Sequence, residues 1–292
     1  MFPPMAGIRR LLGVLMVMVG LVLGGCGGGD DPETSSAPEA LEGEAAAQAI
    51  ADAATKTTTF QGGVEAAMDL AVTGAGANDT SLSLDATVDG AARTGEIVFE
   101  GASGSFTVRL GEESSWVTSD VAAFTDALPE GAEWVEVNPD ELAGLGVDTT
   151  FDEGGLTPQV YLALGATDVA AGEQSEVNGV PVQTYSFAID KDAAVAAAPE
   201  EAKDQVEGAI TLEGENQSIE GEAAIDGEGY LRSLGITGSA EVPGFAKVEV
   251  TSDVEYLDFG VEVPAESPDP ATVVPLSEVP DAGAALQGAL GG

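Results

Sequence analysis

Histidine is absent from the chain, which removes most of the side-chain chemistry that enzymes use near neutral pH. Ser-His-Asp and Cys-His catalytic sites, imidazole acid–base catalysis and histidine-ligated metals all require this residue. Neighbouring carboxylates remain as candidates for acid–base work or calcium binding, at Asp140-Glu141, at Asp152-Glu153, and at Asp226 with Glu228. With 51 acidic residues in the chain such neighbours are expected by chance. We therefore predict no catalytic residue, no metal and no cofactor.

Cys26 is the only cysteine, and it follows an apolar run. The basic pair Arg9-Arg10 precedes this run, and the small pair Gly24-Gly25 ends it. Because the run at 11–23 is shorter than a membrane-spanning helix, the pattern is typical of a secretory signal peptide. The ending resembles the lipobox of bacterial lipoproteins, which implies cleavage between Gly25 and Cys26 and acylation of the Cys26 thiol. The alternative is an ordinary exported protein whose cysteine is incidental.

The charge balance limits the partners. The chain carries 51 acidic and 9 basic residues, a net charge of −42. Nucleic acid is excluded as a partner because its phosphates require clustered lysine and arginine. The acidic residues are scattered, which favours solubility or hydration in salt over a dedicated acidic patch, and argues against electrostatic docking on an anionic membrane. With one cysteine no intramolecular disulfide can form, so the core alone must hold the fold.

Composition and periodicity divide the chain into four parts. We predict a signal peptide at 1–25, a lipidated flexible tether at 26–40, a folded domain at 41–265 and an extended or disordered tail at 266–292. The tether is rich in glycine, proline, serine and acid and has nothing to bury. The tail is inferred from its four prolines at 268, 270, 275 and 280.

Within the domain the apolar period changes from helical to alternating. An alanine-rich helix is predicted at 41–59, a short helix at 156–166 and a longer one near 190–208 that Pro199 interrupts. Alternation predicts strands at 64–72, 82–88, 95–100, 105–110, 115–118, 133–137, 209–213, 219–225, 230–241 and 246–259. Asn178-Gly179 between alternating residues predicts a two-residue hairpin. The sequence therefore predicts an α+β protein with one large antiparallel sheet.

This order of elements resembles the LprG/LppX group (LppX_LprAFG) of actinobacterial cell-envelope lipoproteins, relatives in fold of the LolA-like lipoprotein carriers. Besides the lipobox, the resemblance rests on the helix leading into Thr57-Thr58-Thr59-Phe60 and on segments 177–185, 226–231 and 258–264. It covers residues 41 to 265. It implies a curved half-barrel sheet with helices across its concave face, and an apolar cavity that holds the acyl chains of a lipid or glycolipid.

The resemblance also implies a function. It implies a non-enzymatic lipoprotein, anchored by lipid on the outer face of the cell membrane, that carries or presents a lipid within the cell envelope, with an export partner possible. Candidate lining residues, which could equally be plain core, are Val64, Met68, Leu70, Leu82, Leu84, Phe99, Phe106, Val108, Trp116, Tyr161 and Tyr185.

Two alternatives remain open. The first is a structural or protein-interaction lipoprotein with a fully packed core and an acidic surface that binds a protein partner. Composition alone favours such a core, because protein interiors are normally close-packed. The second is a hydrolase that uses carboxylates.

Overall fold

The structure is a computed structural model that describes residues 36–74, 79–89, 92–111, 114–138, 141, 158–208, 215–241, 247–264 and 266–290. The predicted signal peptide, the Gly25–Cys26 cleavage site and the tether as far as residue 35 lie outside this description. So do Asp140, Asp152-Glu153 and the predicted strand at 209–213.

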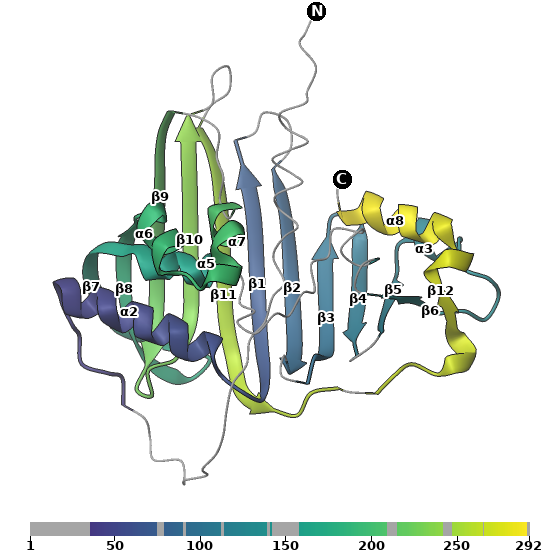
Figure 1. The fold of residues 1–292 in the computed structure, drawn as a ribbon, viewed down its shortest axis with the longest axis horizontal. Helices are drawn as coiled ribbons and strands as arrows, with labels where there is room; N and C mark the ends of the chain where they lie inside the picture. The colour runs from purple at the N-terminus through teal and green to yellow at the C-terminus, as the bar shows by residue number, and fades with distance from the viewer. Residues whose placement is uncertain are drawn as a thin grey trace, which may run out of the picture.

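A single sheet of 12 strands forms the body of the protein, in the order β12-β6-β5-β4-β3-β2-β1-β11-β10-β9-β8-β7 (Figure 1). Its strands are β1 (Gly63–Thr73), β2 (Thr80–Asp89), β3 (Thr94–Gly101), β4 (Gly104–Leu110), β5 (Ser115–Ser119), β6 (Trp134–Val137), β7 (Ala166–Val177), β8 (Val180–Ile189), β9 (Glu215–Asp226), β10 (Leu231–Glu241), β11 (Lys247–Val261) and β12 (Val273–Pro275). Every pairing is antiparallel except that of β12 with β6. The sheet is open, with β12 and β7 at its edges, and the predicted large antiparallel sheet is confirmed.

Alternation along the strands gives the sheet two unlike faces. In β1 the side chains of Val64 and Met68 are buried, whereas those of Glu65 and Asp69 are exposed. Because successive residues of a strand point to opposite faces, the apolar side chains of neighbouring strands gather on one side. We call this side the apolar face and the other the charged face.

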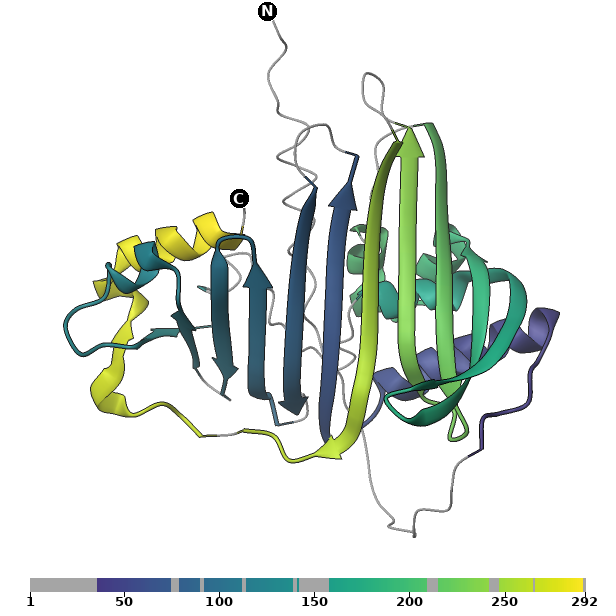
Figure 2. The same cartoon turned by 180° about the vertical axis from the view of Figure 1, so that it is seen from behind.

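The described helices lie in two groups. The first comprises α2 (Gly43–Thr58), α5 (Pro158–Leu162), α6 (Lys191–Ala197) and α7 (Lys203–Gly208), and lies over the half of the sheet that contains β7–β11 (Figure 1). From behind, the strands stand in front of these helices (Figure 2). The second comprises α3 (Ala122–Thr125) and α8 (Pro280–Leu290), at the β6 end. Because α2 contacts β7 as well as β9 and β10, the sheet bends around it at this end.

Local signals in the sequence explain the helix boundaries. The carboxylate of Asp190 caps α6 by accepting a 3.0 Å hydrogen bond from the backbone N–H of Ala193. Pro199 separates α6 from the 3-10 turn at Glu200–Ala202, as predicted. None of the helices within the described ranges is both long and apolar enough to cross a membrane.

The prediction of an extended or disordered tail at 266–292 is wrong over most of its length. Residues Pro270–Thr272 form a 3-10 turn, β12 pairs in parallel with β6, and helix α8 follows. Val279, Ala282 and Leu286 are buried in the main core at helical spacing. Proline is favoured at the first turn of a helix, so Pro270 and Pro280 begin these turns rather than preventing them.

Candidate functional site

The apolar face brings together ten of the eleven predicted lining residues. Strand pairing aligns Met68 of β1 with Leu84 of β2, Leu84 with Phe99 of β3, and Phe99 with Phe106 of β4. The rings of Phe99 and Phe106 stack with centroids 4.4 Å apart. The other residues on this side are Val64, Leu70, Leu82, Val108, Tyr161 and Tyr185.

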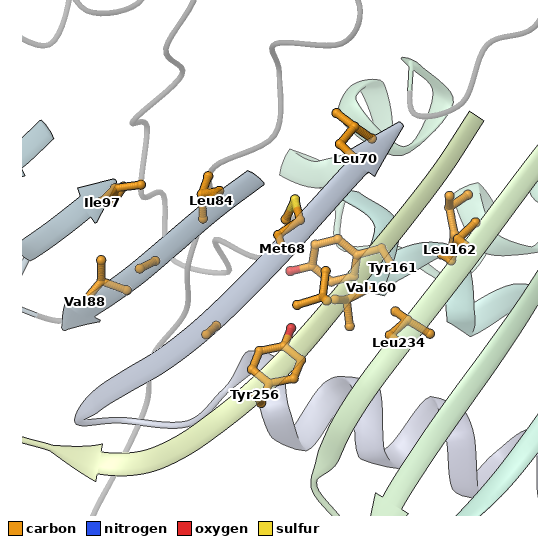
Figure 3. Close-up of a cluster of buried hydrophobic side chains, with 14 of the residues drawn as sticks. Met68, Leu70, Leu84, Val88, Ile97, Val160, Tyr161, Leu162, Leu234 and Tyr256 are labelled. Atoms are coloured by element: carbon orange, nitrogen blue, oxygen red, sulfur yellow. The ribbon is translucent and has the colours of Figure 1, made fainter. Parts of the chain in front are cut away.

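Helix α5 faces the same side chains. Figure 3 shows Val160, Tyr161 and Leu162 of α5 on the side of the sheet that carries Met68, Leu70, Leu84, Val88 and Ile97. A buried hydrogen bond of 3.2 Å, from the Nε2 of Gln159 to the Oγ of Ser252, fixes the helix to β11. The ten predicted residues on this face thus come from six separate segments, β1–β4, α5 and β8, that the fold does bring together.

Trp116 is the exception, and it is removed from the candidate lining residues. It pairs with Arg109, whereas its neighbour Val117 pairs with Val108 on the apolar face. Arg109 forms a 2.7 Å salt bridge with Glu96, and its Cζ atom lies 4.8 Å from the ring centroid of Trp134. The prediction failed for Trp116 because the register of β4 with β5 places its side chain on the charged face.

No ionisable side chain lies on the apolar face within the described parts of β1–β4. The charged residues of these strands, among them Glu65, Asp69, Asp85, Glu96 and Arg109, all occupy the opposite face. Transfer of a charge into such an environment is costly unless the charge is paired. The apolar face is therefore suited to hydrocarbon rather than to a charged ligand.

Tyr256 was missed by the sequence analysis. It lies in β11, is 2% exposed and shares the apolar face with Val254, which pairs with Met68. Its signal was present, because Val250, Val254 and Tyr256 alternate in phase along the predicted strand at 246–259.

The carboxylates Asp226 and Glu228 do not form an acid–base pair. Asp226 is 2% exposed, its Oδ2 lies 2.7 Å from the Nε of Arg232, and its Oδ1 accepts hydrogen bonds from the backbone N–H groups of Glu228 and Tyr230. The Nζ of Lys56 in α2 donates to the backbone oxygen of Glu228. This network therefore fastens the turn between β9 and β10 to the end of α2. Elsewhere in the described ranges no group of three or more metal-ligating residues is placed to hold a metal ion.

A groove of about 450 Å³ lies over strands β8–β11, and it is not the predicted apolar cavity. Its lining includes Ser186, Glu222, Gly235 and Asp253, which pair with one another across the strands. Partial burial is the largest cause that raises the pKa of Asp253, and repulsion from the carboxylates of Asp69, Glu222 and Glu255 raises it further. Asp69 is its direct partner on β1.

Replacing Asp253 with asparagine should stabilise the protein at pH 7 by about 0.2–1 kcal/mol, because like charges directly opposite each other destabilise a sheet. Since its pKa is raised on folding, the native state binds more protons, and stability falls as the pH rises from about 3.9 through the folded pKa. The stability gained by Asp253→Asn should therefore vanish at a pH below both the unfolded and the folded pKa of Asp253. Urea unfolding at several pH values measures this.

Asp85→Asn is the matched control, because Asp85 lies between Ala67 and Val98 and faces no like charge. An unchanged or lower stability of Asp253→Asn at pH 7 would contradict the assignment.

Comparison with known proteins shows likeness at the level of structure only. No family model and no curated protein matches the chain. The crystal structure of LprF from Mycobacterium bovis matches with 13% identity and a TM-score of 0.44, over 77% of this chain and 98% of that one. That of the lipoprotein LppX from Mycobacterium tuberculosis matches with 12% identity and a TM-score of 0.37, over 75% and 97%.

A LolA superfamily protein from Nitrosomonas europaea matches with 7% identity and a TM-score of 0.28, over 75% of this chain and 94% of that one. The solved structures that resemble the chain thus include LprF, LppX and a LolA superfamily protein, the groups that the sequence resemblance named.

Proposed function

We propose that the protein is a lipid-anchored lipoprotein that binds the acyl chains of a lipid or glycolipid on its apolar face and carries or presents that lipid within the cell envelope. The observation that carries the proposal is the separation of the two faces across β1–β4, where one face has no ionisable side chain. The described helices occupy the two ends of that face, and none lies over β2 (Figure 1). The apolar character of this face along β1–β4 supports an acyl ligand.

Binding of this kind would be reversible. Acyl chains that leave a membrane for an apolar protein surface exchange one dry environment for another, so the free energy of transfer is close to zero. A carrier needs this property, since it must release what it binds. The proposed function is binding and transfer of a lipid, without enzymatic activity.

The anchor is the second part of the proposal. Acylation of Cys26 would hold the protein at the outer face of the cell membrane, because each buried methylene contributes about 0.8 kcal/mol. Mass spectrometry of the N-terminal peptide tests it. A peptide that begins at Cys26 and carries acyl chains supports the anchor, whereas a free thiol in the membrane-derived protein contradicts it.

A fluorescent fatty acid tests acyl binding. We expect cis-parinaric acid to bind the purified protein saturably, with a rise in fluorescence that an unlabelled long-chain fatty acid reverses. Fluorescence that rises without saturation, or that no competitor reduces, would argue against a site.

One observation favours a second function. Ile97 and Val108, neighbours on β3 and β4, are completely buried, as in a closed core. A structural lipoprotein that binds a protein partner through its acidic surface would have such a core, and the substitution at Ala86 described below separates the two.

A further inference from the structure

Tyr256 places a hydroxyl group in the middle of an apolar environment. Its ring stacks on that of Phe259, with centroids 5.8 Å apart. Figure 3 shows the hydroxyl directed toward Val160 of α5, beside Leu234 of β10. In the sheet Tyr256 pairs with Ala66.

This hydroxyl differs from that of Tyr185, the other buried strand tyrosine of this face. The Tyr185 hydroxyl accepts a 3.3 Å hydrogen bond from the backbone N–H of Leu41. No other group in the described part of the chain forms a hydrogen bond with the Tyr256 hydroxyl. Burial alone raises the pKa of Tyr256, so the group remains a neutral O–H. A buried donor without an acceptor costs free energy, which a ligand with an acceptor would recover.

The side chains that continue the row from Tyr256 across the sheet are small. Ala66 of β1 is followed by Ala86 of β2, and only then by Ile97 of β3. The adjacent row carries the larger Met68, Leu84 and Phe99. A hydrocarbon chain whose polar end meets Tyr256 would therefore meet the smallest buried side chains of the apolar face at Ala66 and Ala86.

The cations of the neighbouring elements, Lys56 among them, already have partners within the protein, which favours a neutral acceptor. Arg232 lies over the ring of Phe259 but is paired with Asp226. Lys247, the only lysine or arginine in β1 or β11, pairs with Glu249 at the far end of β11. A carboxylate or phosphate placed beside Tyr256 would lose its hydration without gaining a counterion. An ester carbonyl carries no charge and accepts a hydrogen bond.

We propose that the Tyr256 hydroxyl donates a hydrogen bond to the ester carbonyl of a bound acyl lipid, whose chain runs over Ala66 and Ala86. This inference rests on the proposed function. It makes Tyr256 a specificity-determining residue that favours ester-linked over ether-linked lipids.

Competition with two soluble lipids tests the proposal on the full-length protein. Dihexanoylphosphatidylcholine and its di-O-hexyl ether analogue, both below their micelle concentrations, compete with the methyl ester of cis-parinaric acid, which carries no charge. We expect the ester to compete about 2- to 10-fold more strongly than the ether, the range that one hydrogen bond supports. Tyr256→Phe should compete equally with both, and its lipid-free Tm should be no lower than that of the wild type.

Tyr185→Phe is the matched control, since Tyr185 is 3% exposed on the same face but has a partner within the protein. It should lower Tm and leave the ratio of ester to ether competition unchanged, whatever its effect on the affinity for both lipids. Equal competition by the two lipids in the wild type, an ester preference that survives Tyr256→Phe, or a lower Tm of Tyr256→Phe would each overturn the assignment. If the wild type binds neither parinaric acid nor either lipid, the proposed function itself fails.

Discussion

Replacing Arg232 with methionine should destabilise the protein by about 3–5 kcal/mol, the cost of leaving a buried carboxylate without its charge partner. Asp226 is 2% exposed, and its Oδ2 lies 2.7 Å from the Nε of Arg232. The two backbone N–H groups that bond to Oδ1 would remain, but they carry no net charge. The midpoint of urea unfolding, followed by circular dichroism, measures the loss.

The exposed pair of Lys247 and Glu249 provides the control. Its charged atoms lie 3.0 Å apart, but both side chains are more than one third exposed. Lys247→Met should therefore change stability by less than about 1 kcal/mol. A loss from Arg232→Met that is no larger than this would show that the β9–β10 turn does not depend on the buried pair.

Leucine at position 86 should reduce acyl binding by about tenfold or more. Ala86 is buried on the apolar face between Ala66 and Ile97, so a leucine there would occupy the space assigned to the ligand. Exclusion of two methylene groups, at about 0.8 kcal/mol each, accounts for a tenfold loss. The titration with cis-parinaric acid measures the effect, and Tm shows whether the protein remains folded.

The same substitution separates the carrier from the protein with a packed core. If Ala86 were surrounded by close-packed protein, the added volume would cost about 1–3 kcal/mol and would lower Tm. The carrier account expects a nearly unchanged Tm and weak binding. Ala67→Leu is the matched control, because Ala67 lies one residue from Ala66 on the opposite face and should affect neither quantity.

Much of the apolar face could be predicted from alternation. Val64, Met68 and Leu84 were placed correctly because each follows the two-residue period of its own strand. Trp116 was not, because its orientation depends on the register of β5 against β4, which no local pattern specifies. The helix Pro280–Leu290 was missed since its prolines suggested a coil, although its buried residues follow a helical period.

The candidate site required contacts between distant segments. Tyr256 could be assigned to a strand, but its position beside α5 and opposite Ala66 follows from the pairing of β1 with β11. These two strands are separated by most of the chain, and their pairing joins the two runs of strands into one sheet. The difference between Tyr256 and Tyr185 lies in their hydrogen-bond partners, and the sequence contains no signal for it.

Native mass spectrometry of the protein from Gly27 onward, purified from a lipid-containing host, tests the central claim most directly. The account predicts a reproducible added mass that disappears on organic extraction and is identified as an acyl lipid. A protein that retains its bare mass, both as purified and after incubation with membrane lipids, would contradict acyl binding on the apolar face.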